Sequence, residues 1–155
     1  MIERRHPRLK EFDYRTAGAY FITICCEHRE MWFGEIDQSE QRLSEYGRIA
    51  AQEIEAIPER YAYMEIPKYV VMPNHLHMIL LMHDGNDERL SVPQLIGILK
   101  ARITQLCKAA GYPNRRLFQA SFHDHVIRTE QDYAEVWQYI EENPRIWAED
   151  QFYRE

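Results

Sequence analysis

The sequence predicts an α+β protein in which an antiparallel sheet carries helices on one face. Two observations predict this class. Short β-branched and aromatic runs alternate with segments whose apolar residues recur at the helical period. The 155 residues also show no repeat, no low-complexity segment and no linker, and 45% of them are apolar. We therefore expect one domain, spanning residues 1–155, with a core of its own.

The first part of the chain predicts two strand segments and a helix. The run "AYFITICC" at 19–26 is typical of a strand, and "MWFGEI" at 31–36 is expected to extend the same sheet. From Leu43 to Ile57, apolar or small residues recur at the helical period, and Pro58 marks the end of this helix. The strand that ends in "YVVMP" and the strand "HLHMILLM" then form a hairpin, because Pro73-Asn74 between them is a turn signal.

The second part predicts a helix, a strand and a last helix. One face of the first helix is expected to carry Leu95, Ile98, Leu99, Arg102 and Leu106. "FHDHVIRT" at 122–129 is a fourth strand, and the Thr129 hydroxyl can cap the last helix. That helix should bury Tyr133, Val136, Trp137 and Ile140. The first six elements follow the βαββαβ order of a ferredoxin-like sheet, with the last helix added at the C-terminal end.

The composition excludes several classes of protein. No run approaches the roughly 18 apolar residues that a membrane span needs, and the charged start "MIERRHPRLK" is not a secretory signal. Three cysteines without framework spacing indicate reduced thiols. We therefore expect a cytoplasmic protein with no membrane partner.

Charge is distributed unevenly along the chain. The net charge is −6, yet residues 1–16 carry five Lys and Arg against three acids, and residues 91–128 carry six against one. These segments predict either ordinary surface charge or a track for a polyanion. In the second interpretation residues 1–16 form a basic arm. The candidate phosphate contacts are then Arg4, Arg5, Lys100, Arg102, Arg115, Arg116 and Arg128.

Two histidines stand one residue apart in the apolar run "VVMPNHLHMIL" at 70–80. Because side chains alternate across a strand, His75 and His77 point to one face, about 6.5–7 Å apart along it. Two neutral imidazoles so placed can converge on one metal ion. The pattern alone, however, favours ordinary core or surface histidines. A second such pair, His123 and His125, lies in the expected strand at 122–129.

The last helix supplies a second candidate pair. Tyr139 lies on the flank of the apolar stripe, and Asn143 is its neighbour one turn later. If this flank faces the histidines, Asn143 would complete a metal shell and Tyr139 would be a nucleophile. Asn143 also precedes Pro144, and Asn before Pro is a favourable start for a short terminal helix. The two roles of Asn143, metal ligand and helix cap, would use the same side-chain oxygen.

The ligand interpretation gives coherent chemistry. A tyrosine hydroxyl has a pKa of about 10 and is a weak nucleophile at neutral pH. Attack on a DNA phosphodiester needs the phosphate charge neutralised and its oxygens oriented, which a divalent cation does. A shell of two nitrogens and one amide oxygen suits Mg²⁺ or Mn²⁺.

These segments resemble a known family. "VVMPNHLHMIL" resembles the HUH motif (His, bulky hydrophobic, His) of single-tyrosine transposases. "SFHDHVIR" followed by "VWQYIEENPRIW" is similar to the closing signature of REP-associated tyrosine transposases, and "LSEYGRIAAQEIEAIPERY" to their first helix. The resemblance runs over about residues 12–153.

The resemblance implies a ferredoxin-like nuclease that binds single-stranded or hairpin DNA at extragenic palindromic repeats. It implies Tyr139 as the nucleophile, leaving a 5′-phosphotyrosine link and a free 3′-OH, with His75, His77 and Asn143 as metal ligands. It implies a monomer or a homodimer associated with the nucleoid. Two alternatives remain: a catalytically silent protein that recognises palindromic repeats, and, more remotely, a metal-binding enzyme acting on a small substrate.

Overall fold

The computed structural model describes residues 18–37, 40–83 and 89–147. The expected basic arm, with Arg4 and Arg5, lies outside the described residues, as does the loop "DGNDE" at 84–88. None of the described helices is both long and apolar enough to cross a membrane.

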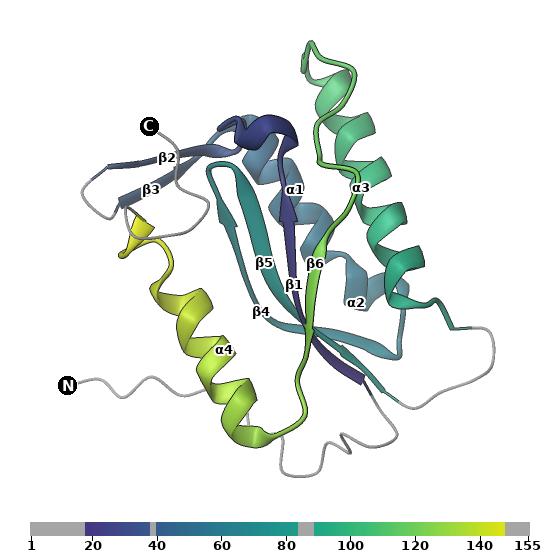
Figure 1. Ribbon diagram of the computed structural model, residues 1–155. Coiled ribbons are helices and arrows are strands. Elements are labelled where there is room, and N and C mark those ends of the chain that lie inside the picture. Colours follow the sequence, from purple (N-terminus) through teal and green to yellow (C-terminus); the bar gives the residue numbers. More distant parts are fainter. Residues whose placement is uncertain (1–17, 38–39, 84–88, 148–155) are drawn as a thin grey trace.

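The centre of the fold is a four-stranded sheet with the order β4-β5-β1-β6 (Figure 1). Its strands are β1 Gly18–Cys25, β4 Met64–Met72, β5 His75–Met82 and β6 His123–Val126. Every neighbouring pair is antiparallel, and β4 and β5 form the expected hairpin. The predicted α+β class and the ferredoxin-like βαββαβ order are therefore confirmed.

The prediction that "MWFGEI" extends this sheet is wrong. Strand β2, Gly34–Asp37, pairs instead with β3, Glu40–Leu43, in a separate two-stranded sheet. The short 3-10 helix η1, Glu27–Arg29, explains the difference. His28 and Arg29 both take left-handed backbone angles there, so the chain turns away from the central sheet after β1.

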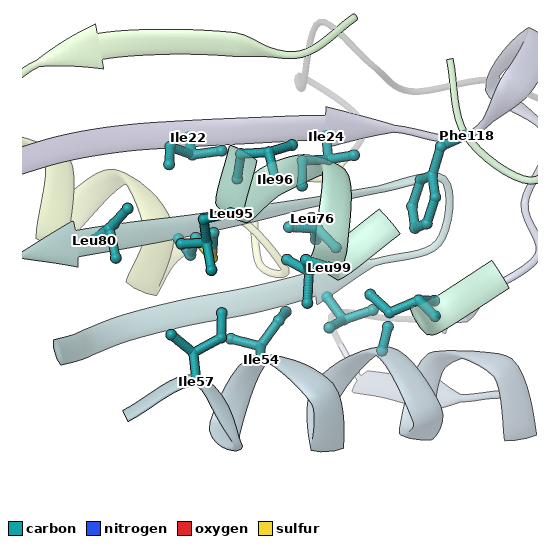
Figure 2. Close-up of a cluster of buried hydrophobic side chains, with 14 of the residues drawn as sticks. Ile22, Ile24, Ile54, Ile57, Leu76, Leu80, Leu95, Ile96, Leu99 and Phe118 are labelled. Atoms are coloured by element: carbon teal, nitrogen blue, oxygen red, sulfur yellow. The ribbon is translucent and has the colours of Figure 1, made fainter. Parts of the chain in front are cut away.

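Three helices cover one face of the sheet: α1 Glu45–Glu55, α2 Ile57–Arg60 and α3 Val92–Ala109. Pro58 does not end the first helix but lies in the first turn of α2. Figure 2 shows apolar side chains of β1 and β5, such as Ile22 and Leu80, meeting side chains from these helices. The buried stripe of α3 is offset from the predicted face, because Ile98 and Leu106 are 38% and 41% exposed whereas Ile96, Ile103 and Cys107 are buried.

Helix α4, Glu130–Glu142, packs on the opposite face of the sheet (Figure 1). Its buried residues Tyr133, Val136 and Ile140 contact Ile79 and Leu81 of β5. As predicted, the Thr129 hydroxyl caps the helix by accepting from the Asp132 amide at 3.0 Å. Because side chains alternate along β5, the face that α4 covers is also the face to which His75 and His77 point.

A charged cluster joins α1, α2 and α3. The Glu53 carboxylate accepts from Arg102 Nε at 2.7 Å and from Arg60 Nη1 at 3.1 Å. Burial alone would raise the pKa of Glu53, but the hydrogen bonds and charges of the two arginines outweigh it and lower the pKa. Arg102, a candidate phosphate contact, thus takes part in a structural ion pair.

We expect Glu53→Gln to lower the free energy of unfolding by about 2 kcal/mol at pH 7, because two charge-assisted hydrogen bonds become weaker. A lowered folded-state pKa stabilises the fold above the unfolded pKa of about 4.3 and loses that effect as the pH falls through the folded value. The difference in the free energy of unfolding between the variant and the unchanged protein should therefore shrink below about pH 4. Urea titrations at several pH values measure this difference, with exposed Glu59→Gln as the control. An equal difference at pH 3 and pH 7 would contradict this account.

Candidate active site

His75 and His77 lie side by side, fully buried beneath α4. Their Nε2 atoms are 3.1 Å apart and their ring centroids 4.6 Å. Burial lowers the pKa of both imidazoles well below the usual value, the neighbouring His77 lowers that of His75 further, and the nearby Asn143 amide opposes both shifts. Both rings are therefore neutral at pH 7, the protonation state that metal binding requires.

The other ring nitrogen of each histidine has a polar partner. His75 Nδ1 lies 2.7 Å from the Asn74 amide oxygen, and His77 Nδ1 lies 2.8 Å from the Thr23 hydroxyl. Thr23 faces His77 directly in the β1–β5 register. If both Nδ1 atoms donate to these oxygens, both Nε2 atoms present lone pairs toward the same place.

Tyr139 is half-buried on α4 beside the two histidines. Its ring centroid lies 5.4 Å from that of His77 and 5.9 Å from that of Phe21. Tyr139 and His77 lie 62 residues apart in the sequence, and they meet because α4 crosses the sheet over β5. The structure thus brings the predicted tyrosine to the predicted histidine pair.

Asn143 completes this cluster at the C-cap of α4 and does not N-cap a terminal helix. It is fully buried at the C-terminal end of α4, with right-handed helical angles of φ −53° and ψ −47° rather than the extended angles of an N-cap. Its Nδ2 donates to the Tyr139 carbonyl at 3.1 Å. Its amide oxygen is buried without a hydrogen-bond partner among the described residues, although the amide lies beside both imidazoles.

These groups fit the donor set that a divalent cation needs. Two imidazole nitrogens face one another, each ring has a polar partner at its Nδ1, and the buried Asn143 amide lies beside both rings. Within the described ranges, no group of three or more His, Cys, Asp or Glu side chains could hold a metal ion. Of the predicted ligands, the Asn143 amide is the third donor group that lies beside the two imidazoles.

The chain is similar to several known proteins. No protein-family model matches the chain. A Haemophilus influenzae protein of uncharacterised function is 33% identical over 97% of this chain and 93% of its own length, so the two belong to one family. A second Haemophilus influenzae protein, named "Putative REP-associated tyrosine transposase", is 26% identical over 85% of this chain and 73% of its own.

Two solved structures are similar to this chain in fold. A REP-associated tyrosine transposase bound to a REP hairpin superposes with a TM-score of 0.63 at 23% identity, covering 94% of this chain and 73% of that one. The chain shares the fold of that REP-associated tyrosine transposase. A Deinococcus radiodurans protein described as a "putative transposase" gives a TM-score of 0.55 at 17% identity, covering 91% of this chain and 96% of that one. The predicted resemblance to REP-associated tyrosine transposases is thus confirmed.

The sequence did not predict three residues that contact the histidine pair. Thr23 and Asn74 bond the histidines, and the buried Trp147 stacks on His75 at 6.2 Å between ring centroids. The β1–β5 pairing would have pointed to Thr23, because it sets Thr23 opposite His77. Trp147 carried no signal, since its approach depends on turns after α4 that the sequence does not specify.

The candidate phosphate contacts of the chain differ in how exposed they are and in which groups they contact. Lys100 donates to the carbonyls of Gln119 and Ala120 at 2.6 and 3.3 Å, and burial lowers its pKa. Arg116 lies 3.5 Å from Glu27. Arg115 and Arg128 are exposed. The second histidine pair, on β6, is exposed rather than buried.

Four cations line one cavity of about 670 Å³ between α3 and residues 115–120. They are Lys100, Lys108, Arg115 and Arg116, and no carboxylate is among the described residues that line it. The cavity is on the α3 side of the sheet, whereas the histidine pair is on the α4 side. Both are at the same end of the sheet, because Gln119 bonds the carbonyl of Cys25 and Cys25 pairs with His75.

Proposed function

We propose that this chain is a metal-dependent DNA strand transferase that cuts single-stranded or hairpin DNA of the REP type through Tyr139. The observation that carries the proposal is the meeting of Tyr139, the histidine pair and the buried Asn143 amide under α4. Such a convergence is typical of a reacting centre rather than of a core. The relatives named as transposases, and the REP hairpin bound by one of them, support DNA as the partner.

In this proposal His75, His77 and Asn143 would hold Mg²⁺ or Mn²⁺, and a cation there would supply Lewis-acid chemistry by neutralising and orienting the phosphate. The Tyr139 oxygen forms a bond to phosphorus, and the bond from phosphorus to the 3′ oxygen breaks. The 5′ side of the DNA then stays linked to tyrosine. The 3′ oxygen leaves as a hydroxyl, gaining one proton for the one that the phenol loses. Phe21 and His77 pack against the Tyr139 ring and fix its direction of approach.

The cavity lined by four cations is the proposed path of the DNA backbone. Its charge suits phosphates, and it lies at the same end of the sheet as His75. Lys108, which the sequence did not single out, joins Lys100, Arg115 and Arg116 there. Arg102 is a weaker candidate than the sequence predicted, because Glu53 holds it. We place the protein in the cytoplasm, where it meets nucleoid DNA.

Replacing both Lys108 and Arg115 with alanine should weaken hairpin binding about equally for all sequences. Each lost phosphate contact should reduce the slope of log affinity against log salt by about 0.7 to 1. Both side chains are exposed, so the fold should persist. Fluorescence anisotropy from low to moderate salt measures the slope. Exposed Arg48→Ala on α1 is the control, and an unchanged slope in the double variant would remove the cavity from the interface.

The alternative is a catalytically silent protein that recognises palindromic repeats. The two are separated by incubating the protein with labelled hairpin DNA and either Mg²⁺ or Mn²⁺, followed by denaturing electrophoresis. A covalent protein–DNA adduct is expected. Tight binding with no adduct in either metal would favour the silent protein, and absence of any DNA binding would revive a metal enzyme with a small substrate.

A further inference from the structure

The buried turn between β4 and β5 places an asparagine directly behind the first histidine. Asn74 is 1% exposed, and its backbone carbonyl accepts from the Cys26 amide at 2.9 Å. The carbonyl of its neighbour Pro73 accepts from the Phe33 amide at 2.9 Å. The turn is therefore held by the segment that follows β1, and Asn74 has little freedom to move.

Both ends of the Asn74 amide are assigned by their partners. Its Nδ2 donates to the Arg29 carbonyl at 3.2 Å, and a carbonyl can only accept. The amide oxygen must then be the atom that lies 2.7 Å from His75 Nδ1. Because this oxygen also can only accept, the His75 Nδ1 must carry the proton. A neutral His75 is left with its lone pair on Nε2.

The Arg29 carbonyl is presented by strained backbone. His28 and Arg29 take φ values of 56° and 55°, in the left-handed region that residues other than glycine rarely adopt. Such strained backbone angles persist only where surrounding contacts enforce them, and they occur most often at functional sites. Here their result is a carbonyl that fixes the amide of Asn74.

His77 is held differently. Its Nδ1 partner is the Thr23 hydroxyl, which can donate or accept. His77 can therefore carry its proton on Nε2 and donate it to His75 at 3.1 Å, or on Nδ1 and donate it to Thr23. Only the second form leaves both Nε2 atoms able to bind one ion. The first ring is fixed and the second can change.

We propose that Asn74 is a positioning residue that locks His75 in the Nδ1-protonated tautomer, while Thr23 lets His77 exchange tautomers when an ion enters. The lock follows from the hydrogen bonds alone. The use of the His75 lone pair by a divalent cation rests on the proposed function. Asn74 acts through His75 and touches neither DNA nor metal in this account.

The tautomers are measured on the full-length, metal-free protein by long-range proton–nitrogen NMR correlation of its histidine rings at pH 7. We expect His75 to show a protonated Nδ1 and a bare Nε2. Asn74→Ala should release the ring into a mixture of tautomers. Asn74→Asp keeps an acceptor at the same place and should retain the lock, and Thr23→Val should leave His75 unchanged.

Mn²⁺ affinity, followed by electron paramagnetic resonance without DNA, gives the second readout. Loss of an outer partner of a metal-binding histidine lowers affinity by about 10- to 100-fold. Asn74→Ala should show such a loss and Asn74→Asp should restore most of it, provided that thermal unfolding finds both variants folded. If the alanine variant does not fold, the tautomer of His75 in the unchanged protein still tests the lock.

Two results would overturn the lock: a protonated Nε2 on His75 in the unchanged protein, or a His75 spectrum that Asn74→Ala leaves unaltered. The metal part fails separately. If the spectra behave as expected but no variant binds Mn²⁺, the lock stands and the proposed metal function does not.

Discussion

Tyr139→Phe should abolish the covalent protein–DNA adduct and lower the cleavage rate by about 10³-fold or more, because the attacking oxygen is gone. Binding of the hairpin should remain within about twofold, since the phenyl ring keeps its contacts with His77 and Phe21. Single-turnover cleavage of labelled hairpin DNA in Mn²⁺ measures the rate, and anisotropy measures the binding.

Tyr133→Phe is the matched control for this variant. Tyr133 lies on the same helix, fully buried against β5, and loses the same atom in the same substitution. Cleavage by the Tyr133 variant should match the unchanged protein. An adduct that survives Tyr139→Phe would assign the nucleophile to another residue.

His77→Ala should lower cleavage by at least about 10²-fold and leave hairpin binding largely intact. One of two nitrogen ligands is removed, and the Lewis acid contributes several kcal/mol to phosphate transfer. Mn²⁺ affinity should fall in parallel. Because His77 is buried and bonded to Thr23, thermal unfolding must be measured beside activity.

His83→Ala provides the comparison for His77→Ala. His83 follows the same strand, and its imidazole pairs with Glu65 at the surface. Its loss should change neither cleavage nor Mn²⁺ affinity. Equal cleavage by the His77 and His83 variants would remove the histidine pair from the reaction.

The element order could be predicted because each core strand and helix shows its own period in the sequence. The pairing partner of a short strand could not. "MWFGEI" has the composition of a core strand, but the strained turn at His28 and Arg29 takes it out of the central sheet. Helix α3 shows a related limit. With apolar residues on several sides, period alone does not decide whether Ile98 or Ile96 faces the core.

The candidate site, like the fold, could be predicted only in part from the sequence. Alternation along a strand was enough to put His75 and His77 on one face, and helical spacing was enough to put Asn143 under Tyr139. Whether Asn143 was the N-cap of a terminal helix depended on its backbone angles, which are helical and place it at the C-cap of α4. The partners Thr23 and Asn74 depend on strand register and on a distant turn, which no local pattern contains.

The most direct test identifies the residue that carries DNA after cleavage. The unchanged full-length protein is incubated with hairpin DNA and Mn²⁺, digested with nuclease and protease, and its peptides are examined by mass spectrometry. The account predicts a nucleotide joined through its 5′ phosphate to Tyr139, and a free 3′-OH on the released strand. A nucleotide on any other residue, or cleaved DNA with no modified peptide, would contradict it.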